Sequence, residues 1–302
     1  MKLGMVGLGR MGANMAERLV RGGHEVVGYD PSSAAVERAR AQGAAASDSL
    51  EKMANLLRAP RTVWIMVPSG DPVDQTIQSL LPHLGGGDVI IDGGNSNYRD
   101  TQRRAGALKD QGIHFVDVGT SGGIWGLKEG YSLMVGGDSE VVRHLTPLFE
   151  TLAPAPDLGW GRVGPSGAGH FVKMVHNGIE YGLMQAFAEG FDLMGRKTDL
   201  TLDLGQISQI WRHGSVVRSW LLDLIARALE QSPALSGIAP YVPDSGEGRW
   251  TVVEAIDLGC AIPVISMALN RRFRSQDEDS FADKLLAAMR QQFGGHAVKE
   301  KS

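Results

Sequence analysis

The sequence lacks the features that mark membrane-spanning, disulfide-stabilised and nucleic-acid-binding proteins. Its 302 residues include one cysteine, Cys260, so no internal disulfide can form, and the apolar residues around it predict a buried, unreactive thiol. No run of about 18 apolar residues occurs, which argues against a membrane-spanning helix. Lysine and arginine total 30 against 34 aspartate and glutamate, and the basic residues are dispersed, so no nucleic-acid partner is expected.

The chain also begins without the pattern of a secretion signal. Residues 1–7 run directly into a β-rich stretch, with no charged segment followed by an apolar core and a cleavage site. A single cysteine fits a reducing compartment, and we expect a cytoplasmic protein with no membrane partner. Hydrophobic residues make up 43% of the chain, enough for a substantial core. The length corresponds to about two domains.

Up to residue 162, short β-rich runs alternate with helical stretches. Strands are expected at residues 2–6, 25–29, 62–67, 89–92, 114–118 and 131–135, with helices that include 11–21, 34–42, 74–81 and 98–109. This alternation predicts βαβ units and a mostly parallel sheet. The first domain, residues 1–162, is therefore expected to be α/β, a doubly wound Rossmann-type domain.

The second half of the chain has a different pattern. The glycine-rich segment 159–169 breaks the strand pattern, and we place the domain boundary there. Helical patterns then follow at residues 168–194, 202–213, 216–231, 251–259, 264–273 and 279–293. No comparable strand signal remains, so residues 163–302 are predicted to form an all-α domain.

A dinucleotide-binding fingerprint follows the first predicted strand and opens the first predicted helix. It consists of Gly7, Leu8, Gly9, Arg10, Met11 and Gly12. The first glycine permits a tight turn, the second lets the backbone approach a pyrophosphate, and the third allows close helix–strand packing. The pyrophosphate would then meet the N-terminus of the helix.

Cofactor choice is predicted from the end of the second strand. Asp30 lies about 20 residues beyond the fingerprint, where a carboxylate binds the adenine ribose hydroxyls and repels a 2′-phosphate. No arginine follows it in the next three residues, so NAD is preferred over NADP. Asp30 could instead cap the following helix, and Arg10 in the fingerprint loop leaves NADP possible but disfavoured.

Two further loops follow predicted strands and should line the same crevice. Val67 and Pro68 follow one strand, and Asn95 follows another. Ligands of such sheets bind at the carboxyl ends of the strands. Asn95 would orient the nicotinamide side, although an asparagine in this position could also be an ordinary turn residue.

A polar stripe on one predicted helix carries the most chemistry. It comprises Lys173, His176, Asn177, Glu180 and Tyr181, at helical spacing within an otherwise apolar helix. Such a helix should be buried on most sides, so its polar groups must find partners or face a cavity. A solvent-facing stripe is the alternative, but its mixed composition differs from the Lys/Glu/Arg pattern usual there. A desolvated lysine can act as a base and a partly buried glutamate as an acid.

These segments resemble the decarboxylating 6-phosphogluconate dehydrogenases. The matches, in the family's order, are Gly-Leu-Gly-Arg-Met-Gly at 7–12, Ile-Asp-Gly-Gly-Asn-Ser at 91–96, Thr-Ser-Gly-Gly at 120–123, Ser-Leu-Met-Val-Gly-Gly at 132–137, Lys-Met-Val-His-Asn-Gly-Ile-Glu-Tyr-Gly at 173–182, Gly-Arg-Trp-Thr at 248–251 and Phe-Gly-Gly-His at 293–296. They span nearly the whole chain. The stripe and the tail motif separate this family from other β-hydroxyacid dehydrogenases.

The resemblance implies oxidative decarboxylation of 6-phosphogluconate to ribulose 5-phosphate and CO2 with reduction of NAD, a step of the pentose phosphate pathway. Lys173 would take the proton of the C3 hydroxyl, and Glu180 would protonate the enediol that remains after CO2 leaves. A β-keto acid loses CO2 readily when its carbonyl is hydrogen-bonded, so no metal is required.

The resemblance also implies the substrate-binding residues. Ser121, Gly122 and Gly123 would bind the carboxylate region, His176 and Asn177 the hydroxyls, and Tyr181, Arg249 and Arg272 the phosphate. In the family's tail motif, matched by Arg290 and His296, these residues reach the substrate of a neighbouring subunit. The implied partner is therefore a second copy of the chain, in a homodimer or homotetramer.

The sequence departs from the family pattern in three places. The chain is short, Arg249 stands where many members have lysine, and the loop 124–129 differs from that of the longer forms. The alternatives are another β-hydroxyacid dehydrogenase, such as one acting on 3-hydroxyisobutyrate, and a non-catalytic NAD-binding sensor. Arg249 and Arg272, which could bind a phosphate, argue against a 3-hydroxyisobutyrate-type enzyme. The presence of both Lys173 and Glu180 argues against a non-catalytic sensor.

Overall fold

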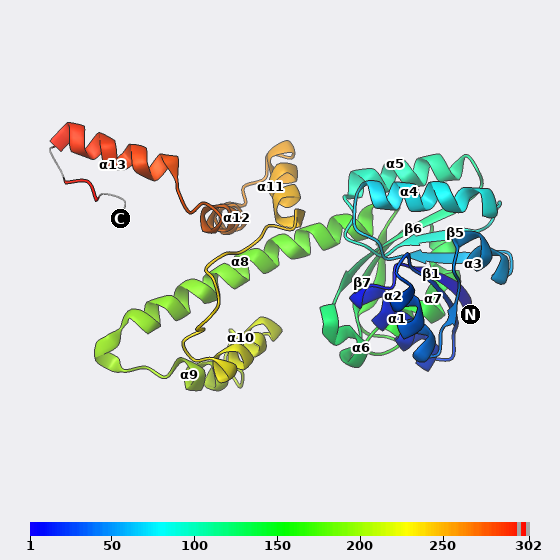
Figure 1. Cartoon of the computed structure of the whole chain (residues 1–302), viewed down its shortest axis with the longest axis horizontal. Coiled ribbons are helices and arrows are strands. Elements are labelled where there is room, and N and C mark those ends of the chain that lie inside the picture. Colours follow the sequence, from blue (N-terminus) through cyan, green and yellow to red (C-terminus); the bar gives the residue numbers. More distant parts are fainter. Residues whose placement is uncertain (295–296, 300–302) are drawn as a thin grey trace. The chain divides into compact units, whose positions relative to one another are not determined.

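A computed structural model describes residues 1–294 and 297–299, and Figure 1 traces the chain. The chain forms two compact units, Met1–Asn177 and Gly178–Ser302, each described here by itself. The packing division falls inside α8 (Ala168–Arg196), because the first turns of this helix pack with the sheet. The domain boundary at residue 162 stays a prediction about the chain's architecture.

The first unit is built on one eight-stranded sheet, in the order β3-β2-β1-β4-β5-β6-β7-β8. Its strands are β1 (Lys2–Val6), β2 (Glu25–Tyr29), β3 (Ala45–Ala46), β4 (Thr62–Ile65), β5 (Val89–Asp92), β6 (His114–Ser121), β7 (Ser132–Gly136) and β8 (Trp160–Gly164). Neighbouring strands run parallel except β6 and β7, which are antiparallel. The mostly parallel sheet predicted from the alternating pattern is confirmed.

Helices lie along both faces of this sheet, and each face has its own core. They are α1 (Arg10–Arg21), α2 (Ser33–Ala41), α3 (Leu50–Leu56), α4 (Asp71–Leu80), α5 (Tyr98–Lys109), the short α6 (Gly126–Glu129) and α7 (Ser139–Leu152). Alternate residues of β4 divide between the cores: Trp64 belongs to one, and Val63 and Ile65 to the other. Burial on both faces explains why the central strands are almost continuously apolar.

The glycine-rich segment at 159–169 was expected to break the strand pattern, and for its first half this expectation is wrong. Trp160–Gly164 forms the edge strand β8, which pairs in parallel with β7. Two of its five residues, Gly161 and Gly164, are glycines and Gly159 precedes it, so hydrophobic periodicity does not reveal the strand. An edge strand needs only one paired side and one covered face, which lowers its demand for apolar residues.

The start of α8 is fixed to β6 by one buried carboxylate. Asp117 on β6 is fully buried and accepts hydrogen bonds from the backbone N–H groups of Gly167 (2.7 Å) and His170 (2.9 Å). These N–H groups belong to the helix N-terminus, where they have no partner within the helix and where negative charge is favoured. The His170 ring also pairs with the Thr101 hydroxyl of α5 at 2.7 Å.

All regular secondary structure among the described residues of the second unit is helical, which confirms the predicted all-α class. After α8 come α9 (Leu204–Trp211), α10 (Trp220–Gln231), α11 (Glu247–Asp257), α12 (Pro263–Ser275) and α13 (Phe281–Gly294). Among the residues described, no helix is both long and apolar enough to cross a membrane.

Two burial expectations are wrong in the single chain. Beyond its first turns, α8 exposes apolar side chains on its surface, including Ile179, Leu183 and Leu193, the last at 72%. Cys260 is also exposed. It lies in the connection between α11 and α12, and connecting segments run over the surface even when their sequence is apolar.

The buried anchor at the start of α8 gives a stability prediction. Asp117→Ala removes both acceptors from the helix N-terminus and leaves two buried N–H groups unpaired, so the free energy of unfolding should fall by about 3 kcal/mol or more. Urea denaturation of the two proteins measures the change. Asp138→Ala is the matched control, because Asp138 caps α7 in the same way, through the N–H groups of Glu140 and Val141, but at the exposed surface. A loss in Asp117→Ala no larger than in the control would contradict the anchoring role.

Candidate functional site

A cavity of about 540 Å³ lies at the carboxyl ends of β1, β2 and β4. It is lined by Val6, Gly7, Gly9, Tyr29, Asp30, Pro31, Leu50, Met66, Val67, Pro68, Pro72, Gln75, Thr76 and Ser79. The fingerprint loop forms one side, and residues of α4 form another. This is the place where doubly wound sheets bind nucleotides.

The glycines of the fingerprint differ in what surrounds them. Gly7 has a positive φ of 91°, and a Cβ on it would lie 2.5 Å from the carbonyl oxygen of Met66. A Cβ on Gly12 would lie 2.0 Å from the carbonyl oxygen of Gly7, so helix and loop are in direct contact. A Cβ on Gly9, the N-cap of α1, would meet nothing within 4 Å. The loop is therefore closed against the sheet at Gly7 and Gly12 but open above Gly9.

Asp30 accepts backbone hydrogen bonds from the fingerprint loop and from the start of α2. One carboxylate oxygen accepts from the N–H of Leu8 at 2.7 Å and the other from the N–H of Ser32, the N-cap of α2, at 2.8 Å. Each oxygen keeps capacity for one more donor, such as a ribose hydroxyl. The described residues that line the cavity include no lysine or arginine to hold a 2′-phosphate. Arg10 is exposed on the first turn of α1.

Val67 and Pro68 line the cavity as predicted, whereas Asn95 is exposed in the loop after β5. The neighbouring Ser96 is buried and donates to the carboxylate of Asp92 at 2.6 Å. The hydrogen bond between Ser96 and Asp92 thus fixes the loop that carries Asn95 to the end of β5, the strand that pairs with β4.

In the first unit, Lys173 packs against β6. A Cβ on Gly119 would lie only 2.4 Å from the Cβ of Lys173, so the strand and α8 touch here with no space for a side chain. Lys173 is 7% exposed. Three successive contacts join β6 to α8: residue 117 meets 170, residue 119 meets 173, and residue 121 meets 176. Every second residue of a strand faces the same side, and residues three apart on a helix share one face, so the two spacings agree.

The predicted carboxylate-binding segment lies beside the same helix. The Ser121 hydroxyl is 3.5 Å from Nε2 of His176, whose Nδ1 is 3.1 Å from Oδ1 of Asn177. Gly122 has φ of 135°, a conformation that favours glycine, and Gly123 begins a short 3₁₀ turn. The structure therefore brings Lys173, His176, Asn177 and the 121–123 segment together within the first unit.

The second unit gathers the three residues expected to bind phosphate. The guanidinium carbon of Arg272 lies 3.4 Å from the ring centroid of Tyr181. Asp244 joins the others: it accepts from the Tyr181 hydroxyl at 3.4 Å and pairs with the Arg249 guanidinium at 2.7 Å. Glu180, half-buried, precedes Tyr181 on α8.

Two family models match the chain. One, described as the NAD binding domain of 6-phosphogluconate dehydrogenase, matches residues 2–161, and the other, its C-terminal domain, matches residues 169–284. The chain belongs to the 6-phosphogluconate dehydrogenase family.

Individual relatives agree with this assignment. The NAD(+)-dependent, decarboxylating 6-phosphogluconate dehydrogenase of Haloferax volcanii is 44% identical over 302 residues, covering 100% of this chain and 99% of that protein. The Bacillus subtilis protein YqeC is also 44% identical and is covered over its whole length. A Saccharomyces cerevisiae 6-phosphogluconate dehydrogenase is 39% identical, but the chain spans only 61% of it. The compact length is thus shared with the first two.

Solved structures give the same picture. A Plasmodium falciparum 6-phosphogluconate dehydrogenase matches with a TM-score of 0.84 and 27% identity, covering 100% of this chain and 66% of that one. A Mycobacterium tuberculosis 3-hydroxyisobutyrate dehydrogenase matches with a TM-score of 0.74 at 23% identity, a likeness of fold alone.

Sequence reasoning about the 6-phosphogluconate dehydrogenase motifs missed Asp244 and Asp117. Asp244 stands in the turn-forming stretch Pro243-Asp244-Ser245-Gly246, directly before α11, and this turn signal next to the Gly-Arg-Trp-Thr motif could have singled it out. Asp117 carried a weaker signal, a lone carboxylate within an apolar strand.

Of the two predicted tail residues, the structure describes one. Arg290 lies on α13 with an exposed side chain. His296 lies outside the described residues. Among the residues described, no group of three or more histidine, cysteine, aspartate or glutamate side chains could hold a metal ion.

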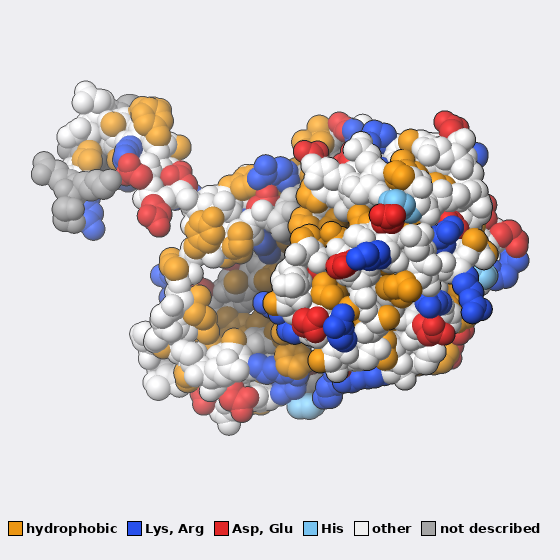
Figure 2. All heavy atoms as spheres, turned by 45° about the vertical axis from the view of Figure 1, so that its right-hand side comes forward, with side chains coloured by type: hydrophobic (Ala, Val, Ile, Leu, Met, Phe, Trp, Pro, Cys, Tyr) orange, Lys and Arg blue, Asp and Glu red, His pale blue; other side chains and the backbone are white. Residues whose placement is uncertain are grey.

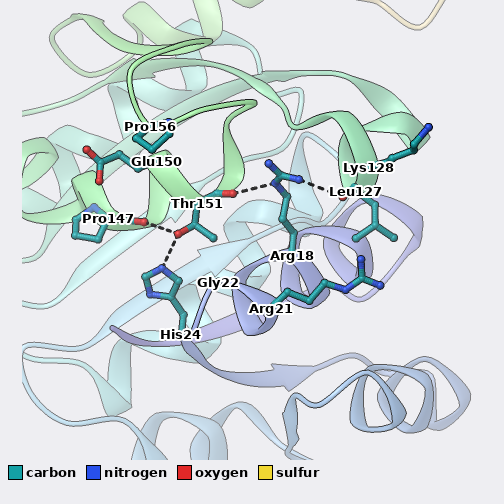
Figure 3. A pocket seen from close by; sticks show the side chains of 10 residues that line it. All are labelled: Arg18, Arg21, Gly22, His24, Leu127, Lys128, Pro147, Glu150, Thr151 and Pro156. Atoms are coloured by element: carbon teal, nitrogen blue, oxygen red, sulfur yellow. Dashed lines mark hydrogen bonds between the residues drawn. The ribbon is translucent and has the colours of Figure 1, made fainter.

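A second cavity, of about 730 Å³, lies between the end of α1, the short helix α6 and the C-terminal half of α7 (Figure 3). Its central residue, Arg18, donates to the carbonyl oxygens of Leu127 (3.2 Å), Thr151 (2.9 Å) and Ala153 (2.6 Å). The neighbouring cations Arg21 and Lys128 are paired with Glu17 and Glu129. The hydrogen bonds of Arg18 therefore hold the segment after residues 121–123 against α1.

The open space above Gly9 gives a prediction about cofactor binding. Gly9→Val should fold normally, because φ of −62° suits any residue and its side chain meets no protein atom. The side chain would occupy the space for the pyrophosphate, so the Kd for NADH should rise at least about tenfold. NADH fluorescence titration and thermal unfolding are the measurements. Gly12→Ala is the contrasting variant, because its Cβ meets the Gly7 carbonyl and should lower the Tm. Normal NADH affinity in Gly9→Val would contradict this assignment.

Proposed function

We propose that the protein oxidises and decarboxylates 6-phospho-D-gluconate to D-ribulose 5-phosphate and CO2, with NAD as hydride acceptor. The observation that carries the proposal is the burial of Lys173 against β6, beside Ser121 and His176, in a chain whose whole length matches a relative named for this reaction. A domain of residues 1–162 would bind NAD, and residues 163–302 would supply catalytic and assembly surfaces.

Lys173 and Glu180 lie seven residues apart on one continuous helix, α8, and would perform the two proton transfers. NAD, when bound, accepts the hydride from C3 of the substrate. Neutral Lys173 takes the proton of the C3 hydroxyl, and in its protonated form it donates a hydrogen bond to the new ketone oxygen. That bond stabilises the charge that develops as CO2 leaves. Glu180 then donates a proton to C1 of the enediol.

The remaining site residues would hold the substrate. Ser121, Gly122 and Gly123 would bind the carboxylate region, and His176 and Asn177 the hydroxyls. Arg249 and Arg272, with Tyr181, would bind the phosphate, for which arginine offers bidentate hydrogen bonds. Asp244 pairs with Arg249 in the structure, so it compensates that charge before phosphate binds.

The cofactor residues would divide the nucleotide between them. Leu8, Gly9, Arg10 and Met11 would meet the pyrophosphate with the helix N-terminus, while Gly7 and Gly12 shape the loop. Asp30 would bind the adenine ribose, and Val67, Pro68 and Asn95 would adjoin the nicotinamide half. NADP is disfavoured because its 2′-phosphate would meet the Asp30 carboxylate.

One assay tests the proposed function directly. The purified protein is mixed with 6-phosphogluconate and either NAD or NADP, and NADH formation and CO2 release are followed together. We expect equimolar NADH and CO2, with a higher kcat/KM for NAD. NADH without CO2, or activity only with 3-hydroxyisobutyrate, would favour a different β-hydroxyacid dehydrogenase. No NADH with any sugar acid would favour a non-catalytic sensor.

The proton-transfer roles predict separate effects for two substitutions. Lys173→Met should lower kcat by about 10²–10⁴-fold, the scale of a positioned acid–base group, while substrate binding stays measurable. Glu180→Gln should lower kcat with little change in the KM for NAD. Glu189→Gln, an exposed change on the same helix, is the control and should leave both constants near normal. Near-normal turnover in Lys173→Met would rule out the assigned base.

We further propose that the active unit is a homodimer or homotetramer in the cytoplasm. The second unit exposes apolar side chains from several helices, among them Leu193, Ile210, Ile256 and Phe281, the last at 76% (Figure 2 shows one face). Exposed apolar surface on this scale marks an interface. Arg290 and His296 of one chain would then reach the substrate of its partner.

Shared sites predict complementation between chains that are each impaired in a different part of the site. Arg290→Ala and His296→Ala should each raise the KM for 6-phosphogluconate with little effect on NAD. A mixture of Lys173→Met and Arg290→Ala chains, unfolded and refolded together, should regain about a quarter of wild-type activity, because one site of each hybrid dimer holds both intact groups. Lys173→Met mixed with the Lys173→Met, Arg290→Ala double variant is the control and should regain none. If the first mixture is no more active than the same amount of Arg290→Ala chains alone, at a 6-phosphogluconate concentration well below their raised KM, the sites are not shared.

A further inference from the structure

One cation, Arg104 on α5, is buried beneath the loops that surround the cofactor cavity. Arg104 is 3% exposed, and its guanidinium donates several hydrogen bonds. Nε and Nη2 donate to the two carboxylate oxygens of Asp74, at 3.1 and 2.8 Å, and Nη2 also donates to the carbonyl oxygen of Gly70 at 3.0 Å. Nη1 lies 3.3 Å from the Ser96 hydroxyl, to which it donates.

One group of these partners belongs to the start of α4, a helix whose other residues line the cavity. Gly70 is the N-cap of α4, and Asp74 lies in the first turn of that helix. The same helix lines the cavity with Pro72, Gln75 and Thr76, and the loop before it does so with Val67 and Pro68. By binding both the cap and the first turn, Arg104 fixes the end of α4 that faces the loop.

The other group belongs to the loop after β5. Ser96 follows Asn95 and donates to Asp92, the last residue of β5, at 2.6 Å. The Asp92 carboxylate lies 3.7 Å from Nη1 of Arg104 and also accepts from the N–H of Gly94 at 3.1 Å. The guanidinium therefore joins the β5 loop to α4.

We propose that Arg104 is a positioning residue of the NAD site, setting the separation between α4 and the loop that carries Asn95. Arg104 is not among the residues that line the cavity, so it acts through these two segments. The guanidinium holds its N–H donors in a rigid planar fork, so it can bind the carboxylate, the carbonyl and the hydroxyl at fixed positions. A lysine ammonium carries its three donors on one nitrogen and cannot reproduce that spacing. This inference rests on the proposed function only in taking NAD as the ligand.

The adjacent Arg103 provides a matched control. It donates to the same Asp74 carboxylate, at 3.0 and 3.1 Å, but from the surface, where 58% of its side chain is exposed. Arg104 first, and Arg103 after it, hold the pKa of Asp74 well below its usual range. Both arginines thus share one carboxylate, and Arg104 alone of the two also donates to Gly70 and Ser96 in the described contacts.

The experiment compares Arg104→Lys with Arg103→Lys in the full chain. NADH binding is measured by fluorescence titration without any sugar acid, and the KM values for NAD and 6-phosphogluconate are measured at steady state. We expect Arg104→Lys to raise the Kd for NADH and the KM for NAD by about tenfold or more, because α4 and the β5 loop would no longer be held at a fixed separation. The KM for 6-phosphogluconate should change much less, and Arg103→Lys should resemble the wild type.

Ser96→Ala is the second variant, in case Arg104→Lys does not fold. It removes the hydroxyl between the guanidinium and Asp92 but keeps every charge, so it should weaken NADH binding by a smaller factor. Equal effects of the two lysine substitutions, a parallel loss of both ligands' affinity with Tm, or unchanged NADH binding in Ser96→Ala would each overturn the proposal. Because NADH binding needs no turnover, an inactive wild type would count against the proposed reaction and leave this test intact.

Discussion

The arrangement of the catalytic groups depends on one contact, the buried Asp117 carboxylate at the N-terminus of α8. A carboxylate in a protein interior is costly unless hydrogen bonds compensate it. Here the compensation comes from the helix itself, through the N–H groups of Gly167 and His170. The same contact therefore satisfies the buried charge and the unpaired helix terminus. A helix held in this way cannot rotate about its axis. Its contact with β6 therefore sets the direction in which the Lys173 side chain projects from the helix.

The tight approach at Gly119 extends this constraint along the helix. A side chain there would overlap Lys173, so the strand and α8 lie at backbone contact distance. The next outward residue of β6, Ser121, then falls beside His176. The strand that binds the helix thus continues directly into the segment proposed to bind the substrate carboxylate. Precision of this kind matters for catalysis, because binding energy is effective only when reacting groups are already in place.

Much of this could be predicted from the sequence, because the signals were local. The fingerprint, the apolar strands and the helical periods each depend on neighbouring residues, and they gave the fold class correctly. The edge strand Trp160–Gly164 was missed because its glycines hide its pairing with β7. Asp244 was missed for a different reason: its role depends on Tyr181 and Arg249, which come near it only in the folded chain. The exposure of Cys260 likewise depends on where α11 ends, which apolar composition does not specify.

The exposed apolar face of the second unit links stability to function. The expectation that α8 is buried on most sides followed from its composition, and one chain leaves Leu183 and Leu193 exposed. Hydrophobic burial is worth about 25 cal/mol per Å², so covering several such side chains favours association. In the proposed assembly, the chain that covers this face would also deliver Arg290 and His296. The partner would then bury the apolar side chains that α8 exposes in a single chain. It would also supply the last groups that bind the substrate, so only the assembled protein would be fully active.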